Sequence, residues 1–233
     1  MNINHNPDEM AKTIDTLYQP GDVFECRILK AESNYGGKKN YTGYFQYDGN
    51  NAHQIVNEIL KVPPAMGIYV TLNPIDPSLL ACSNHKMKVA ETGESTSDKD
   101  ILIRRHLLVD IDPIKKSGTS ATDAQTQLAH KQAELVFNYL KSLGWPDPII
   151  CFSGNGFHLL YAVDLPPNDN DLLKKCLETL AVLFNTNTVS IDRNVANAAR
   201  ITRLYGTVAR KGDEVEQMGI YHRVSKIMHI PQE

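Results

Sequence analysis

The sequence predicts an α+β fold, on three observations. Hydrophobic residues make up 42% of the 233 residues, which is enough for one domain or for two lobes that share a cleft. Short segments rich in branched and aromatic residues alternate with longer segments of helical periodicity. From Ile101 onward the order is strand, helix, two strands, helix and short strands, a pattern close to a split βαβ unit. We therefore expect a single domain over residues 1–233.

The first hundred residues are expected to combine strands with two short helices. A helix is predicted over residues 8–18, because Met10, Ile14 and Leu17 lie on one stripe, and a second over 52–60. The other elements expected in this part are a strand at 23–31, a hairpin within 33–51, and a buried strand at 66–72. Residues 91–100 are polar and rich in Ser and Thr, which predicts a flexible surface loop between lobes.

The second part contains the most strongly marked helix. Thr122 and Gln125 match a capping box, and Gly144 provides a C-terminal stop. The apolar face expected for this helix consists of Leu128, Leu135, Val136, Tyr139, Leu140 and Leu143. A second helix is expected at 169–184. The strands expected around these helices are 149–152, 157–163, 189–191, 199–205 and 218–221.

Charge and cysteine usage restrict the classes of function. The formal net charge of −3 gives no global signal for nucleic acid, so a polyanion site must come from local clustering. Residues 193–211 provide such a cluster, with five basic residues and no Asp or Glu. The 4 cysteines show no CxxC pairing, so neither a zinc site nor a disulfide framework is indicated. With no signal peptide and no run near ~20 apolar residues, we expect a soluble, cytoplasmic protein without membrane contact.

Two aspartates at the end of an apolar run are the most informative feature. In HLLVDIDP, Asp110 and Asp112 are two residues apart, so in a strand both carboxylates leave the same face with Cα atoms roughly 7 Å apart. Pro113 cannot extend the hydrogen-bond ladder, and carboxylates at the end of a buried strand are costly unless paired or bound to metal. Asp192 likewise ends the apolar triplet VSI. Three carboxylates can hold two Mg²⁺ or Mn²⁺ ions ~3.5–4 Å apart.

A glycine turn, SGNGFH, is the second motif. Gly154 and Gly156 allow the backbone to point consecutive N–H groups into a concavity. The Ser153 hydroxyl and the His158 imidazole would add donors for phosphate oxygens. Taken alone, the segment is more typical of a glycine hairpin with a structurally satisfied histidine. Together with the arginines that follow Asp192, it indicates an anion-binding site next to the carboxylates.

The order of these motifs resembles the catalytic core of the archaeo-eukaryotic primase superfamily, especially the primase-polymerases of plasmids, phages and CRISPR-associated systems. That family is marked by an apolar run with Asp-x-Asp, then Ser-x-Gly-x-x-His, then an apolar run ending in Asp, as in LLVDID, SGNGFH and VSID here. RLYGT, at residues 203–207, matches a further family feature, a basic residue shortly before Gly-Thr. The resemblance covers residues 101–211, and YVTLNPID at 69–76 is more weakly similar.

The resemblance implies a two-lobed primase-polymerase core, with an N-terminal αβ lobe over 1–100, an RRM-like lobe over 101–233 and the active site between them. It implies two groups of site residues, the catalytic metal ligands Asp110, Asp112 and Asp192, and the nucleotide-binding Ser153, Gly154, His158, Arg200 and Arg203. The implied activity is template-directed nucleotidyl transfer with two Mg²⁺ or Mn²⁺ ions, making primers or extending DNA or RNA in replication of mobile elements.

The partners implied by the same resemblance are a single-stranded DNA template, a primer and nucleoside triphosphates, with helicase, CRISPR or replication proteins as further partners of a monomeric domain. Many relatives have Pro where Tyr205 stands, and some carry a zinc module that this chain lacks, so primer initiation is less strongly implied than nucleotide addition. Tyr69, Asn73 and Tyr205 are candidates for the sugar pocket by their placement.

Two alternatives remain open from the residues alone. In an aspartate-nucleophile phosphohydrolase, Asp110 would attack phosphorus and Asp112 would act as acid or base. Such enzymes usually have Thr or Val where Ile114 stands, and a later Gly-Asp-x-x-x-Asp where this chain has Gln217. A non-catalytic nucleic-acid-binding module would bind in a salt-sensitive manner without metal-dependent incorporation.

Overall fold

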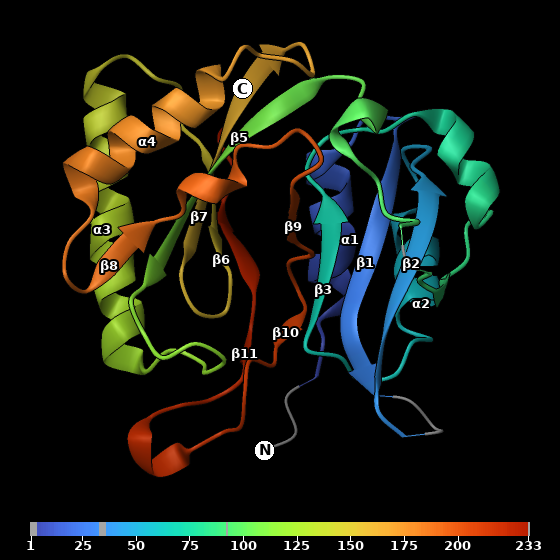
Figure 1. Cartoon of the computed structure of the whole chain (residues 1–233), viewed down its shortest axis with the longest axis horizontal. Helices are drawn as coiled ribbons and strands as arrows, with labels where there is room; N and C mark the ends of the chain where they lie inside the picture. Colours follow the sequence, from blue (N-terminus) through green and yellow to red (C-terminus); the bar gives the residue numbers. More distant parts are fainter. Residues whose placement is uncertain (1–3, 33–35, 92, 233) are drawn as a thin grey trace.

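The protein combines two five-stranded antiparallel sheets with helices packed against them (Figure 1). This computed structural model describes residues 4–32, 36–91 and 93–232. The predicted α+β class is confirmed. Among the described residues, no helix is both long enough and apolar enough to cross a membrane.

The first sheet has the strand order β4-β2-β1-β3-β9. Its strands are β1 (Val23–Glu32), β2 (Lys38–Gln46), β3 (Gly67–Thr71), β4 (Lys88–Val89) and β9 (Ile201–Arg203). β9 comes from the part of the chain expected to form the second lobe, yet it pairs with β3 through Tyr69 opposite Arg203. The boundary expected at residue 100 therefore does not separate the strands of the two sheets.

Two helices, α1 (Pro7–Leu17) and α2 (Ala52–Ile59), contribute to the core of the first sheet (Figure 1). The start of α1 is specified locally, because the Asn6 side chain accepts a hydrogen bond from the Glu9 N–H at 3.1 Å and Pro7 occupies the first turn. The predicted helices at 8–18 and 52–60 therefore match within about a residue. The tip of the predicted hairpin, residues 33–35, lies outside the described residues.

The second sheet has the order β12-β6-β7-β5-β8. Its strands are β5 (Arg104–Pro113), β6 (Ile149–Phe152), β7 (Phe157–Leu165), β8 (Val189–Ile191) and β12 (Lys226–His229). The helices α3 (Asp123–Ser142) and α4 (Leu172–Phe184) lie on its outer side (Figure 1). β10 (Val208–Ala209) and β11 (Arg223–Val224) form a separate two-stranded ribbon. Short 3₁₀ turns are Pro77–Cys82, Asp98–Asp100, Arg193–Val195 and Glu216–Met218.

The capping box of α3 is confirmed, but four of the six residues predicted for its apolar face are wrong. The Gln125 N–H donates to Thr122 Oγ1 at 3.2 Å, and the Thr122 N–H donates to Gln125 Oε1 at 2.9 Å. The buried residues of α3 are Ala129, Gln132, Ala133, Val136 and Leu140, whereas Leu128, Leu135, Tyr139 and Leu143 are exposed. Small alanines let the helix axis approach the sheet, so the apolar residues of greatest volume do not mark the buried face.

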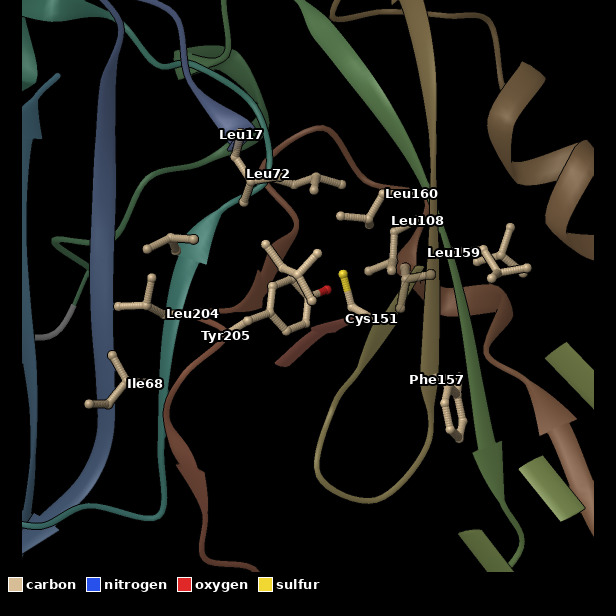
Figure 2. Close-up of a cluster of buried hydrophobic side chains, with 14 of the residues drawn as sticks. Leu17, Ile68, Leu72, Leu108, Cys151, Phe157, Leu159, Leu160, Leu204 and Tyr205 are labelled. Carbon is tan, nitrogen blue, oxygen red and sulfur yellow. The ribbon is translucent and has the colours of Figure 1, made fainter. Parts of the chain in front are cut away.

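A continuous hydrophobic core joins the two sheets on one side of the molecule. Ile68 from the first sheet, Leu72 just after β3, and Leu108 and Leu160 from the second sheet belong to one buried cluster (Figure 2). Tyr205 lies between them, on the segment that leaves β9. The sheets are thus held at a fixed distance by packed side chains rather than by a flexible linker.

Two other expectations are wrong. In the predicted flexible loop at 91–100, the described residues 93–100 are anchored, because the buried Thr96 donates its N–H to the carboxylate of Glu25 at 2.9 Å, and Tyr44 donates to the Glu94 carbonyl at 2.6 Å. Residues 218–221 are not a strand: a 3₁₀ turn ends there at Gly219, whose φ is +65°, and β11 and β12 follow.

Candidate functional site

A pocket of about 320 Å³ lies between the two sheets. Its walls come from β3 and β9 of the first sheet and from β5 and β7 of the second. The predicted site residues that line it are Asp110, Asp112, Ser153, His158, Asp192, Arg200 and Arg203. Gly154 is the one predicted site residue that does not line this pocket. Segments more than 90 positions apart in the sequence therefore meet at one place, with carboxylates and guanidinium groups facing the same space.

The acidic wall is formed by β5, whose alternation places Asp110 and Asp112 on the pocket side. Asp110 lies opposite His158 in the β5–β7 pairing, and Asp110 Oδ1 is 3.4 Å from His158 Nε2. Among the described residues, this buried oxygen has no hydrogen-bond partner. Burial opposes ionisation of Asp110, but electrostatic interactions with His158 and Arg200 outweigh it and hold its pKa below the usual value.

The pKa of Asp112 is shifted in the opposite direction. Burial, followed by repulsion from the Asp110 carboxylate, raises the pKa of Asp112 to about 6. Two carboxylates side by side in a partly desolvated pocket repel each other, and a cation placed between them would remove that repulsion.

Asp192 follows β8 and is brought against β5 by its backbone, because its N–H donates to the Asp110 carbonyl at 2.9 Å. Its side chain is engaged locally: Asp192 Oδ1 accepts from the N–H and the side-chain amide of Asn194, at 2.8 and 3.1 Å. In the part of the chain that the structure describes, no three His, Cys, Asp or Glu side chains converge closely enough to hold a metal ion. The three carboxylates thus share a pocket without forming a preassembled metal cluster.

The basic wall contains a buried guanidinium group with unused donors. Arg203 is 9% exposed, its Nη2 donates to the Tyr69 hydroxyl at 3.1 Å, and its guanidinium lies 4.5 Å from the centre of the Tyr69 ring. For Arg203 Nε and Nη1, the described residues offer no hydrogen-bond partner. Because buried charged donors without partners are costly, this arrangement favours an anionic ligand in the pocket. Arg200, which also lines the pocket, donates to the Asn194 carbonyl.

The glycine turn is closed on itself, which agrees with the alternative of a glycine hairpin and not with an open anion-binding turn. Ser153 Oγ accepts from the N–H groups of Gly156 and Asn155, at 3.0 and 3.4 Å, and donates to the Gly156 carbonyl at 3.1 Å. These N–H groups are therefore already satisfied. Gly156 instead allows close packing on β5: a Cβ there would lie 2.3 Å from both the Ile111 carbonyl oxygen and Asp112 Oδ1. Gly154, with φ of +98°, packs in the same way against Ala209.

A buried hydroxyl behind His158 was not predicted. The Tyr205 hydroxyl lies 2.7 Å from His158 Nδ1, and Thr202 Oγ1 lies 3.3 Å from the same hydroxyl. Tyr205 is fully buried, and burial raises its pKa well above the usual value, so the hydroxyl keeps its proton. A neutral Tyr205 that donates to Nδ1 would leave the His158 proton on Nε2, facing Asp110 and the pocket. A tyrosine in an apolar run gives no sequence signal for this role.

The three residues predicted as candidates for the sugar pocket lie at different places in the structure. Tyr69 lines the pocket, whereas Tyr205 supports His158 from behind. Asn73 is buried elsewhere, where it donates to the Ala198 carbonyl and accepts from the Arg105 N–H. Lys211 and Asn155 also line the pocket and were not singled out by sequence. Lys211 was visible only as one member of the basic cluster.

No protein-family model matches the sequence, and no curated protein matches it. Among solved structures, the chain is similar to the crystal structure of primase RepB', with a TM-score of 0.47 and 11% sequence identity. The similarity covers 96% of this chain and 56% of the other, so this chain spans little more than half the length of that primase.

Proposed function

We propose that this chain is a template-directed nucleotidyltransferase of the primase-polymerase type. The observation that supports it best is the polarity of the pocket, with the Asp110 and Asp112 carboxylates on one wall and the buried, partly unsatisfied guanidinium of Arg203 on another. A nucleoside triphosphate with its divalent cation has the matching chemistry, since the phosphates suit the arginine and the cation suits the carboxylates.

The carboxylate pair fits a hard cation such as Mg²⁺ or Mn²⁺. Asp110 Oδ1 is a buried oxygen without a hydrogen-bond partner among the described residues, and Asp112 is destabilised as an anion by burial and by its neighbour. Asp192 would join them only by releasing Asn194. When bound, the cations would promote ionisation of the attacking hydroxyl and neutralise negative charge on the phosphates.

The side chains of this chain would position the nucleotide for attack. In the proposed reaction, a primer 3′-hydroxyl attacks the α-phosphorus of the nucleotide and pyrophosphate leaves, so the protein contributes positioning and electrostatics rather than a nucleophile. Arg203 and Arg200 would bind phosphate oxygens, and His158, held by Tyr205, would donate from Nε2 into the pocket. The closed turn at Ser153 would support β5 from the side.

The proposal includes the remaining features that the resemblance implies. These are a two-lobed core with the site between the lobes, a single-stranded DNA template with primer, two cations, and a cytoplasmic role in replication of a mobile or CRISPR-associated element.

The test is extension of a primed single-stranded template with NTP or dNTP, in Mn²⁺ or Mg²⁺. We expect Asp110→Asn and Asp112→Asn to reduce incorporation at least 10²-fold, because each removes a charge facing the cation. Asp164→Asn is the matched control, since Asp164 is exposed on β7, outside the pocket. Release of phosphate with a trapped phospho-aspartate would instead indicate a phosphohydrolase, and salt-sensitive binding without incorporation would indicate a non-catalytic module.

A further inference from the structure

A second pocket, of about 630 Å³, continues from the first. Met66 and Lys211 line both pockets, so the two spaces adjoin at these residues. The second pocket is bounded on one side by β1 and the start of β2, and on the other by the segments around 117–118 and 210–213. It is about twice as large as the first, and therefore has room for more than the phosphates of one nucleotide.

The charge of this second pocket is predominantly positive. Its basic lining residues are Lys30, Lys38, Arg210 and Lys211, against two acidic residues, Glu32 and Asp213. The basic groups come from both walls rather than from one exposed face. A concave pocket with cations on two walls concentrates positive potential, and its size suits several phosphates of a strand more than a single anion.

A strained backbone places one of these lysines on the wall. Between Ile28 opposite Tyr41 and Ala31 opposite Lys39, β1 has one residue more than β2, which makes a β-bulge. Lys30 lies in this bulge with φ of +52°, a conformation that costs free energy for a residue with a side chain. The Asn40 side chain accepts from the Lys30 N–H at 2.9 Å and holds the bulge in place. Glycine would fit this position without strain, so the lysine there calls for a functional reason.

The lining also indicates how a ligand would be recognised. Among the described residues of this pocket, His222 carries the only aromatic ring, and its Nε2 lies 2.8 Å from the Gly212 carbonyl oxygen. The described lining therefore offers few aromatic rings on which bases could stack, but several basic side chains that could bind phosphate. Such a site would bind the phosphate backbone of a nucleic-acid strand irrespective of its base sequence.

We propose that the second pocket binds the phosphodiester backbone of the single-stranded template next to the nucleotide pocket, through Lys30, Lys38 and Arg210. The proposal rests on the proposed function for the identity of the strand. It assigns a binding site outside the residues that the motifs identify, and it makes binding independent of base sequence.

The test is binding of fluorescein-labelled oligothymidylate to the full chain by anisotropy, at several salt concentrations. We expect Lys30→Gln and Lys38→Gln each to reduce the slope of log K against log salt by about 0.7, and the double variant by about twice that. Lys131→Gln, on the exposed side of α3, is the matched control and should leave the slope unchanged. An abasic oligonucleotide of equal length should bind like oligothymidylate, because phosphates provide the contacts.

A second variant separates the role of Lys30 in binding from any role in folding. Lys30→Gly relieves the positive φ while removing the ammonium group, so we expect a higher urea midpoint together with weaker oligonucleotide binding. If Lys30→Gly and the double glutamine variant bind oligonucleotide as the control does, the proposal is overturned. Reduced affinity for Mn²⁺-nucleotide with unchanged oligonucleotide binding would also overturn it, because the pocket would then hold the triphosphate.

These outcomes are distinguishable from failure of the proposed function. Lysine-dependent oligonucleotide binding in a protein that incorporates no nucleotide would support the strand site and refute nucleotidyl transfer. Incorporation by the wild type together with unaltered binding and extension by the double variant would support nucleotidyl transfer and refute the strand site.

Discussion

Removing one hydroxyl group, by Tyr205→Phe, should test whether His158 is held from behind. Tyr205 is 0% exposed, and its ring packs in the core between the sheets (Figure 2), so phenylalanine keeps the packing and removes only the oxygen. That oxygen lies 2.7 Å from His158 Nδ1. After the substitution, Nδ1 retains only Thr202 Oγ1, at 3.4 Å.

The substitution should lower the free energy of unfolding, because it leaves the buried acceptor His158 Nδ1 without a good hydrogen-bond donor. A buried polar group that loses its partner costs about 1–3 kcal/mol. With a urea m-value of about 2–3 kcal/mol per molar, as expected at this size, the unfolding midpoint should fall by about 0.3–1.5 M with m unchanged. Nucleotide affinity should fall as well, because His158 is then free to rotate or to place its proton on Nδ1.

Tyr161→Phe is the matched control. Tyr161 is also buried, but within the described residues its hydroxyl has no hydrogen-bond partner, so its removal should be neutral or slightly stabilising. Urea unfolding of both variants, with ¹⁵N NMR of the histidine rings, makes the comparison. Equal midpoints for the two variants, and an unchanged His158 tautomer, would refute the view that Tyr205 positions this imidazole.

Three further outcomes are expected. Gly156→Ala should lower the free energy of unfolding by about 1–3 kcal/mol and weaken Mn²⁺ binding measured by EPR. The reason is that the new methyl group meets the β5 backbone and Asp112 rather than the end of a flexible side chain. Glu25→Ala should lower the free energy of unfolding, measured in urea, by about 3–5 kcal/mol, because it leaves the Arg27 charge and the Thr96 N–H without their buried partner. Glu25→Gln should lower it less. Burial lowers the pKa of His106 to about 4, so the neutral ring stabilises the fold fully above pH 6.5. As pH falls from 6.5 toward 4, the free energy of unfolding should decrease by up to about 3 kcal/mol, and His106→Gln should flatten this pH dependence.

Local patterns predicted most of the helices and strands well, because short-range physics determines them. The alternation of HLLVDIDP placed Asp110 and Asp112 on one face of β5, and Thr122 marked the start of α3 by its capping box. The wrong face of α3 had a different cause. Its burial depends on how closely the helix approaches the sheet, and the alanines that permit this approach have weak hydrophobic signals.

The partners of the site side chains could not be predicted, because they depend on contacts between distant segments. The closed hydrogen bonds of the turn at Ser153, the Tyr205 hydroxyl behind His158 and the engagement of Asp192 by Asn194 are all properties of the folded chain. The sequence identified which groups gather, but not which of their polar atoms are already satisfied. That distinction decides which atoms remain available for a ligand.

The crossing of β9 into the first sheet explains why the site depends on the whole domain. Arg203 reaches the pocket from a strand that pairs with β3, whereas Asp110 and Asp112 belong to the other sheet. A motion that separated the sheets would therefore separate the Arg203 guanidinium from the carboxylates before either sheet unfolded. Because the core around Leu72, Leu108 and Tyr205 opposes that motion, substitutions in this core should lower nucleotide affinity in proportion to their effect on the docking of the two sheets, even though they do not line the pocket.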